Sequence, residues 1–200
     1  MHEQAKNFTV HIKNSFPDFF KNNRVLDVGS GDINGNNRFL FENCSYDGND
    51  VYSAPNVTIV SKTTALPFAD ETFDTICSTE CFEHDPEYEG SFQKIVKMLK
   101  PGGLFFFTCA STGRPEHGTR RTSPRDSYGT IGDVNGWTDY YKNLTLKELD
   151  DSVNVKETFA LYSSWYCPET KDLYFYGIKN GGSQVYNQIQ YTQNSCIHTG

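Results

Sequence analysis

Hydrophobic and polar residues alternate along this chain with two different periods. Apolar residues recur at helical spacing in residues 3–21 and again in residues 92–99, and this period predicts two amphipathic helices. Elsewhere the chain has short apolar runs that are rich in β-branched and aromatic side chains, a composition typical of strands. The runs that predict strands cover residues 24–28, 45–51, 56–60, 73–79, 104–110, 153–163 and 173–179.

Prolines, glycines and small polar residues mark where the predicted elements begin and end. Pro17 divides the first helix, and Pro101 with the two glycines after it ends the second, because proline cannot continue a helix. A further helix is expected from residues 38–41. Thr145 and Glu148 form a capping-box pattern that begins a short helix. Strands that alternate with helices predict an α/β fold, with a mostly parallel sheet covered by helices on both faces.

Length and composition indicate one globular domain. The chain has 200 residues, of which 36% are hydrophobic, enough to bury a full core. We expect the domain to span residues 1–180, with an N-terminal helical segment at residues 1–22. Residues 181–200 are rich in Gly, Ser, Gln, Asn and Thr, and this composition predicts a polar tail that is poorly ordered or loosely docked.

Charge and cysteine content narrow the class of protein. The formal net charge is −7, which disfavours binding to nucleic acid or to an anionic membrane. No apolar run approaches the ~20 residues of a membrane helix, and the first residues lack the layout of a signal peptide. The six cysteines include no Cys-x-x-Cys pair, as expected of thiols in a reducing compartment. We therefore expect a cytoplasmic protein, monomeric or homodimeric, without a metal site.

A glycine-containing turn follows the first predicted strand. It reads Asp27-Val28-Gly29-Ser30-Gly31, and its glycines let the backbone turn sharply and approach a ligand. A dinucleotide-binding turn would need a third glycine at position 34, where this chain has Asn34. The acid before the first glycine suits a ligand that carries a positive amino group. An ordinary strand-to-helix turn is the alternative.

A second acid stands at the end of the next predicted strand. Asp50 lies 21 residues beyond Gly29, and a carboxylate at about this spacing can accept hydrogen bonds from both hydroxyls of a ribose. Asp47 competes for this role, and a solvated loop acid is the alternative for Asp50.

Four motifs in order carry a resemblance to a known family. They are the turn itself, the strand-end acid, Leu66-Pro67-Phe68-x-Asp70-x-x-Phe73-Asp74, and Leu99-Lys100-Pro101-Gly102-Gly103. Together they resemble the class I S-adenosylmethionine-dependent methyltransferases, especially the type 11 group, over about residues 24–110. The resemblance implies a Rossmann-like fold, with a central seven-stranded sheet whose last strand pair is antiparallel. It also implies S-adenosyl-L-methionine as cofactor.

The resemblance further implies a role for each matched residue. The methionine part of the cofactor would meet the turn and the end of the fourth strand, the ribose would meet Asp50, and the adenine would meet the segments that follow. The cofactor-binding residues implied in this way are Asp27, Gly29, Ser30, Gly31, Asp50, Val51, Ala65, Leu66, Thr79 and Glu80. The chain departs from the family at Ile33, where a third glycine is common, so we expect a longer variant of the turn.

Two later segments extend the resemblance to about residue 150. Ser78-Thr79-Glu80-Cys81-Phe82-Glu83-His84 resembles the Ser-Thr-Glu-x-x-Glu-His segment of a methyltransferase subgroup. The same subgroup carries a Gly-x-Pro-x-His-Gly loop, here residues 113–118, and a later aromatic pair. His84 and His117 are therefore candidate catalytic bases, because histidine changes charge near neutral pH. A structural histidine that hydrogen-bonds a loop is the alternative for each.

The loop after the fifth long strand carries candidate acceptor-binding residues. Four arginines stand in it, and guanidinium groups bind phosphate or carboxylate in a bidentate fork; a solvated charged loop is the alternative. We take Arg120 and Arg121 as the anion-binding pair. Tyr140 and Tyr141, with Trp137, are expected to form either an aromatic wall of the site or part of the core.

The sequence therefore predicts methyl transfer by in-line displacement. The acceptor would be a small or medium-sized molecule, with sugar-containing and anionic compounds among the candidates. A non-catalytic protein that binds the cofactor as a scaffold is the first alternative. A nicotinamide-dependent oxidoreductase is the second, and it would need the glycine that is absent from position 34.

Overall fold

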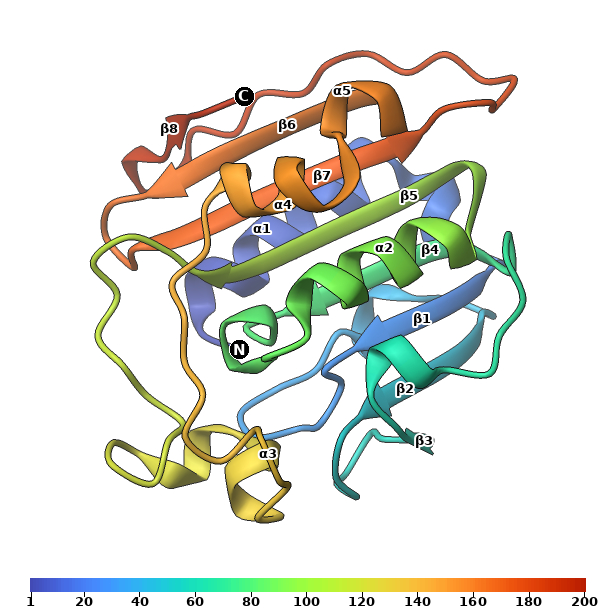
Figure 1. Cartoon of the computed structure of the whole chain (residues 1–200). Coiled ribbons are helices and arrows are strands. Elements are labelled where there is room, and N and C mark those ends of the chain that lie inside the picture. Colours follow the sequence, from blue (N-terminus) through green and yellow to red (C-terminus); the bar gives the residue numbers. More distant parts are fainter.

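The computed structural model describes residues 1–200, apart from the side chain of Asn194. Its centre is one eight-stranded sheet with the strand order β3-β2-β1-β4-β5-β7-β6-β8 (Figure 1). The strands are β1 (Arg24–Val28), β2 (Ser45–Asp50), β3 (Ile59–Val60), β4 (Phe73–Thr79), β5 (Leu99–Ala110), β6 (Phe159–Cys167), β7 (Asp172–Lys179) and β8 (Ile197–His198).

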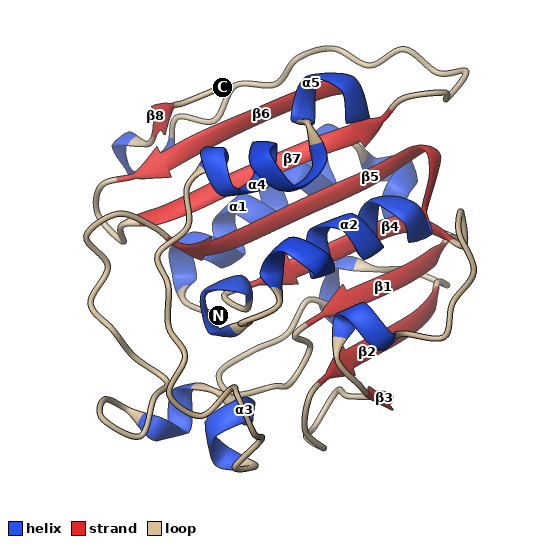
Figure 2. Ribbon diagram, viewed as in Figure 1, coloured by secondary structure: helices blue, strands red, loops and turns tan.

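The helices lie on both faces of this sheet (Figure 2). The α-helices are α1 (Glu3–Ser15), α2 (Tyr88–Met98), α3 (Tyr128–Ile131), α4 (Leu146–Val153) and α5 (Val155–Thr158). Short 3-10 turns cover Pro17–Phe20, Arg38–Leu40, Thr63–Ala65, Phe82–His84, Pro124–Asp126 and Gln193–Ser195. Of the helices that the structure describes, none is both long and apolar enough to cross a bilayer.

Strand directions confirm the Rossmann-like α/β fold that the sequence predicts. The β1, β2, β3, β4 and β5 pairings are parallel, whereas β7 runs antiparallel to both of its neighbours, β5 and β6. The sheet has eight strands rather than the expected seven because residues near the C-terminus pair with β6 as β8.

Alternate residues of the central strands fill two separate cores. On β5, Phe105 and Phe107 pack on the face that α2 and α4 cover, and Leu104 and Phe106 pack on the face that α1 covers. All four side chains are fully buried. Burial on both faces explains why this strand reads as a continuous apolar run in the sequence.

The segment after β1 does not form the helix expected from residues 38–41. It contains a single 3-10 turn at Arg38–Leu40. Asp32 accepts hydrogen bonds from the backbone of Gly35 and from the side chain of Asn36, and Asn36 accepts one from the backbone of Arg38. Such local side-chain hydrogen bonds compete with helix formation. These hydrogen bonds produce a longer turn, as expected from the presence of Ile33 in place of a third glycine.

Several strand boundaries also differ from the expectation, among them the start of β5, which lies at Leu99 instead of residue 104. The strand expected over residues 153–163 begins only at Phe159, because α5 occupies Val155–Thr158. Asn154, which has a left-handed φ of 48°, separates α4 from α5. The strand expected over residues 56–60 contracts to β3.

The C-terminal segment is docked on the domain rather than loosely held. Tyr191 is only 3% exposed, and its ring packs on Phe8 at 5.2 Å and on Trp165 at 5.9 Å. Tyr186 adds ring contacts with Phe16 and Phe19. A few aromatic residues therefore hold a segment whose composition is otherwise polar.

Candidate active site

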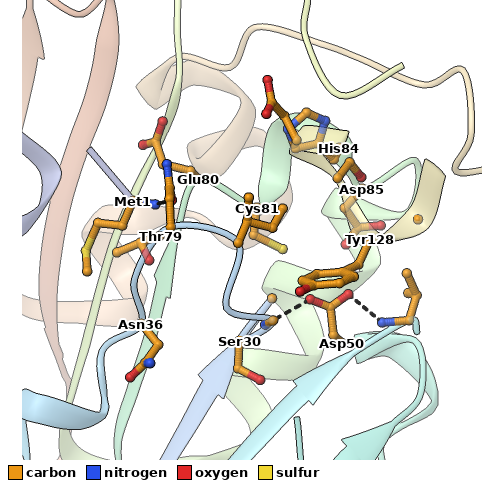
Figure 3. Close-up of a pocket in the computed structure, with 18 of the residues that line it drawn as sticks. Met1, Ser30, Asn36, Asp50, Thr79, Glu80, Cys81, His84, Asp85 and Tyr128 are labelled. Carbon is orange, nitrogen blue, oxygen red and sulfur yellow. Dashed lines mark hydrogen bonds between the residues drawn. The ribbon is translucent and has the colours of Figure 1, made fainter. Parts of the chain in front are cut away.

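A pocket opens where the carboxyl ends of β1, β2 and β4 meet, the edge of a parallel sheet where ligands commonly bind. The loop that contains α3 folds back over this edge (Figure 1). The predicted site residues on the pocket wall are Asp27, Gly29, Ser30, Gly31, Asp50, Val51, Thr79, Glu80, His84 and His117. Figure 3 shows Glu80 on one side of the pocket, Asp50 on another, and Cys81 between them.

The turn after β1 requires glycine at two positions. Gly29 has a φ of +69°, and a Cβ atom there would overlap the side chain of Cys81. A Cβ atom at Gly31 would overlap the ring of Tyr128 and come within 2.8 Å of an Asp50 oxygen. The glycines therefore let the backbone of the turn approach its neighbours closely.

Asp50 fixes the turn to β2. Its carboxylate accepts one hydrogen bond from the backbone N–H of Gly31 at 3.1 Å and one from that of Val51 at 2.7 Å (Figure 3). A carboxylate has about four lone-pair positions, so acceptor capacity remains. Burial raises the pKa of Asp50 to about 6. Asp47, the competing candidate, lies away from the pocket and pairs with Arg24 at 3.7 Å.

Asp27 is buried below the turn and already has hydrogen-bond partners. Its carboxylate accepts hydrogen bonds from the amide of Asn37 at 3.1 Å and from the hydroxyl of Tyr46. Burial raises its pKa, and these hydrogen bonds oppose that effect. Asn37 also donates to the hydroxyl of Thr79 at 3.2 Å, so Asp27 ties the ends of β1, β2 and β4 together.

Glu80 is the centre of a paired polar cluster. It follows β4 with a left-handed φ of 53°. One carboxylate oxygen accepts from the Thr108 hydroxyl at 2.8 Å, and the other lies 3.4 Å from Nε2 of His2. The same His2 nitrogen is 2.8 Å from Asp172. Burial alone would raise the pKa of Glu80, but His2 and Thr108 hold it at about 2.

His84 and His117 come together from segments far apart in the sequence. Their rings are 4.9 Å apart and nearly perpendicular, and the ring of Tyr141 packs on both. Burial, together with the neighbouring His117, lowers the pKa of His84 to about 3. Glu83 lies next to this pair and is fully buried. Burial raises its pKa, and the charges of Glu80 and Asp172 add to the rise.

The long loop between β5 and α4 supplies two aromatic residues of the pocket wall. Tyr128 lies beside Asp50 and donates a hydrogen bond to the backbone oxygen of Asp32 at 3.0 Å. Trp137 is 6% exposed, and the ammonium group of Lys62 lies 4.7 Å from the centre of its ring. The sequence predicts Trp137 as part of an aromatic wall or of the core, whereas nothing in the sequence marks Tyr128.

Other wall residues also escaped the sequence analysis. Thr63, Cys81, Asp85 and Arg114 line the pocket. Their shared signal is position, because each of them stands within a few residues of a strand's carboxyl end or of a predicted site residue. Arg114 is also one of the four loop arginines weighed for anion binding, whereas neither residue type nor spacing marks out the other three.

The other six predicted site residues do not line the pocket. Leu66 packs in the core that α2 covers, and Ala65 lies next to it in a 3-10 turn. Tyr141 packs on the rings of His84 and His117, and Tyr140 precedes it in the loop. The guanidinium groups of Arg120 and Arg121 lie outside the pocket and pair with acids of the same loop, namely Glu116, Asp133 and Asp139.

The sequence is similar to those of known methyltransferases. A family model described as a methyltransferase domain matches residues 26–107. The malonyl-acyl-carrier-protein O-methyltransferase 1 of Coxiella burnetii is 30% identical over 135 residues, which span 64% of this chain and 45% of that protein. The phosphoethanolamine N-methyltransferase 2 of Caenorhabditis elegans is 29% identical over 124 residues, 54% of this chain and 28% of that protein. The chain therefore spans less than half the length of either relative.

Solved structures show the same fold. The 1,6-didemethyltoxoflavin-N1-methyltransferase of Burkholderia thailandensis superposes with a TM-score of 0.61 and covers 90% of this chain and 79% of that one. Sequence identity in this comparison is 15%, so the likeness concerns the fold. That enzyme was crystallised with bound 1,6-didemethyltoxoflavin and S-adenosylhomocysteine.

Proposed function

We propose that the chain is a class I S-adenosylmethionine-dependent methyltransferase and that it transfers the cofactor's methyl group to a small or medium-sized acceptor. The acceptor would bind beside His84 and His117. The observation that carries the proposal is the single pocket wall that joins the glycine turn and Asp50 to this histidine pair.

The residues of the pocket fit the cofactor of this family. The glycine turn leaves room for close approach of a ligand, and Asp50 keeps acceptor capacity that two ribose hydroxyls can use. Val51 follows Asp50 on the wall and offers an apolar contact to the adenine. The acids Asp27 and Glu80 lie where a positive amino group would be stabilised. Ala65 and Leu66 stay predicted adenine neighbours through the backbone.

The bound cofactor supplies an electrophilic methyl group on a sulfonium. The protein's task is then to hold the acceptor atom in line with that group. His84 is unprotonated at neutral pH, because its pKa is lowered to about 3. Its ring and that of His117 can accept hydrogen bonds from an acceptor hydroxyl or amine and so orient it.

The charge of the pocket wall favours an acceptor group that is neutral or cationic. Asp50, Glu80 and Asp85 all lie on the wall. Arg114 is there too, but it already contacts Asp172 at 3.4 Å and the backbone of Thr170. We therefore expect an anionic group only on a part of the acceptor that extends beyond the pocket, toward Arg120 and Arg121.

Calorimetry with S-adenosylmethionine and S-adenosylhomocysteine tests the cofactor half of this proposal. We expect both to bind with a stoichiometry of one. Asp50→Ala should weaken binding by about 10- to 100-fold, because hydrogen bonds to a charged group contribute about 1.5–3 kcal/mol. Absence of binding to the folded protein would overturn the proposal.

Turnover separates an enzyme from a scaffold. The protein is incubated with methyl-labelled cofactor and a fractionated extract of its source, and the labelled product is identified by mass spectrometry. We expect a labelled small molecule with the wild type and none with Asp50→Ala. Tight cofactor binding without transfer to any fraction would favour the scaffold alternative.

A further inference from the structure

Glu83 is a buried carboxylate without a well-formed partner. Its side chain is fully buried, and among the described residues neither carboxylate oxygen has a hydrogen-bond partner. The backbone amides of Glu83 and Ala110 influence its pKa but do not form well-aligned hydrogen bonds with it. Because buried carboxylates are normally paired, hydrogen-bonded or bound to metal, this position calls for a ligand.

Two histidines bring donor atoms to the same place. Nδ1 of His84 is also buried and lacks a partner among the described residues. One donor atom each from Glu83, His84 and His117 lies within 4.8 Å of the other two. Gly118 makes this approach feasible, since a Cβ atom there would come within 2.5 Å of the His84 ring.

His117 is held in the tautomer that a metal ligand needs. Its Nδ1 atom lies 3.2 Å from the backbone oxygen of Pro115. A carbonyl oxygen only accepts hydrogen bonds, so Nδ1 carries the proton and Nε2 keeps its lone pair. Metal-binding histidines are typically oriented by this kind of hydrogen bond.

We propose that Glu83, His84 and His117 bind a divalent transition-metal ion such as zinc. Two imidazoles and one carboxylate form a donor set that such ions prefer, and three protein ligands leave coordination positions for another molecule. Donors bound to zinc at about 2.0–2.2 Å in a tetrahedron stand about 3.3–3.6 Å apart, so donor atoms that lie up to 4.8 Å apart must approach one another by at most about 1.5 Å. His84 and His117 line the pocket, and the open positions therefore face it.

The proposed function gives this ion a role, and only the role rests on that function. An ion between the two histidines would bind an oxygen or nitrogen of the acceptor directly and polarise it. The acceptor atom would then be held at the histidine pair through the ion. Binding of the ion itself depends on the three side chains alone.

A second histidine and acid cluster provides an internal comparison. His2, Glu80 and Asp172 also offer donors within 4.8 Å of one another. His2 Nε2 and Asp172 Oδ2 form no hydrogen bond of good geometry, but these groups pair by charge, with His2 at 2.8 Å from Asp172 and 3.4 Å from Glu80. We therefore expect the ion at Glu83 and not at Glu80.

Titration of the full-length protein with zinc alone tests the proposal. The protein is first stripped with a chelator, and binding is followed by calorimetry, with cobalt absorption spectra as a signature of imidazole coordination. We expect one site per chain. Glu83→Gln and His117→Ala should each weaken it by at least about 100-fold, since even residues outside the ligand shell change affinity 10- to 100-fold. His198→Ala and His2→Gln serve as matched controls and should keep wild-type affinity.

Each outcome decides the proposal. Absence of a one-to-one site overturns it, and so does a site that survives Glu83→Gln and His117→Ala but is lost in His2→Gln. Wild-type far-ultraviolet circular dichroism, together with retained S-adenosylhomocysteine binding, shows that a variant has folded. A protein that binds zinc but not S-adenosylhomocysteine would contradict the proposed function and leave the metal site standing.

Discussion

Glu80 and Glu83 stand three positions apart on the same loop, yet their surroundings are opposite. Glu80 contacts a histidine and a threonine hydroxyl, and its pKa is lowered to about 2. Glu83 is completely buried without a hydrogen-bond partner among the described residues, and burial raises its pKa. Both lie beside the pocket. Proximity to a site therefore does not distinguish a supporting carboxylate from one that awaits a ligand, whereas the number of partners does.

The two acids have different roles in the protein. The Glu80 cluster joins residue 2 to β4 and, through Asp172, to β7, so its interactions stabilise the fold around the pocket. Glu83 costs folding free energy as it stands, because a buried carboxyl without a partner loses its hydration. Such a cost is common where a residue serves binding or catalysis.

The largest effect is expected from removing Glu80. Its pKa falls from 4.5 to about 2 on folding, and 1.36 kcal/mol per pH unit converts this difference to about 3 kcal/mol. Glu80→Ala should therefore lower the free energy of unfolding by about 3 kcal/mol at pH 6, measured by urea denaturation. A carboxyl with a depressed pKa contributes above its unfolded pKa, so the difference should shrink as the pH falls from 4.5 through 2. An unchanged difference at pH 2 would contradict the pairing.

Glu83→Gln should change the free energy of unfolding in the opposite direction and stabilise the protein. A raised pKa in the folded state penalises the ionised form, so the wild type loses stability relative to the variant as the pH rises above the unfolded value of 4.5. In chelator-treated protein at pH 8, the variant should gain about 1 kcal/mol or more. Zinc should reverse the order by stabilising only the wild type. A loss of several kcal/mol in the chelated variant would mean that Glu83 has a structural partner.

Asp50 has fewer unmet hydrogen bonds than Glu83 and a higher pKa than Glu80. Its protonation should make cofactor affinity depend on pH. Its pKa is raised to about 6, and ribose hydroxyls bind its ionised form better. From pH 7.5 to pH 5 the ionised fraction falls about tenfold, so the dissociation constant of S-adenosylhomocysteine should rise by up to about tenfold. Calorimetry across this range measures it, and Asp50→Asn should flatten the profile. A flat wild-type profile would remove Asp50 from the ribose site.

The smallest effect is expected from the exposed arginines of the long loop. Arg120 and Arg121 are more than half exposed and pair with neighbouring acids, and exposed pairs contribute little. The double variant R120A/R121A should keep the wild-type denaturation midpoint and cofactor affinity. A higher Michaelis constant for the acceptor, with no other change, would instead support the predicted acceptor contact.

Local patterns were sufficient for the strands that build the cofactor side of the sheet. Arg24–Val28 and Phe73–Thr79 have the bounds that the apolar runs predict, because buried parallel strands show their burial directly in composition. The helix expected from residue 38 failed, since Asp32 and Asn36 satisfy backbone groups locally. The strand predicted from residue 153 begins too early, because four residues are too few to distinguish a helical turn, here Val155–Thr158, from the start of a strand.

Site residues at the end of a single strand could be predicted from the sequence. Contacts made by loops that are distant in the sequence could not. Gly29 and Gly31 follow β1, and Asp50 is the last residue of β2. Tyr128 reaches Asp32 across 96 positions of sequence, and no period marks such a contact. The assembly of Glu83 with His117 has the same origin. The sequence predicts no metal site, because the third ligand of the proposed one, His117, comes from a different loop than Glu83 and His84.

The short strands at the two edges of the sheet have a consequence for behaviour at high protein concentration. β3 and β8 are each two residues long. An edge strand pairs with other molecules through its row of unpaired amides and carbonyls, and natural proteins limit this hazard by keeping edges short. The long strands β5 and β7 lie inside the sheet, and β6 is partly covered by the docked C-terminal residues. Removing residues 181–200 would expose the nine residues of β6 and create a surface prone to aggregation.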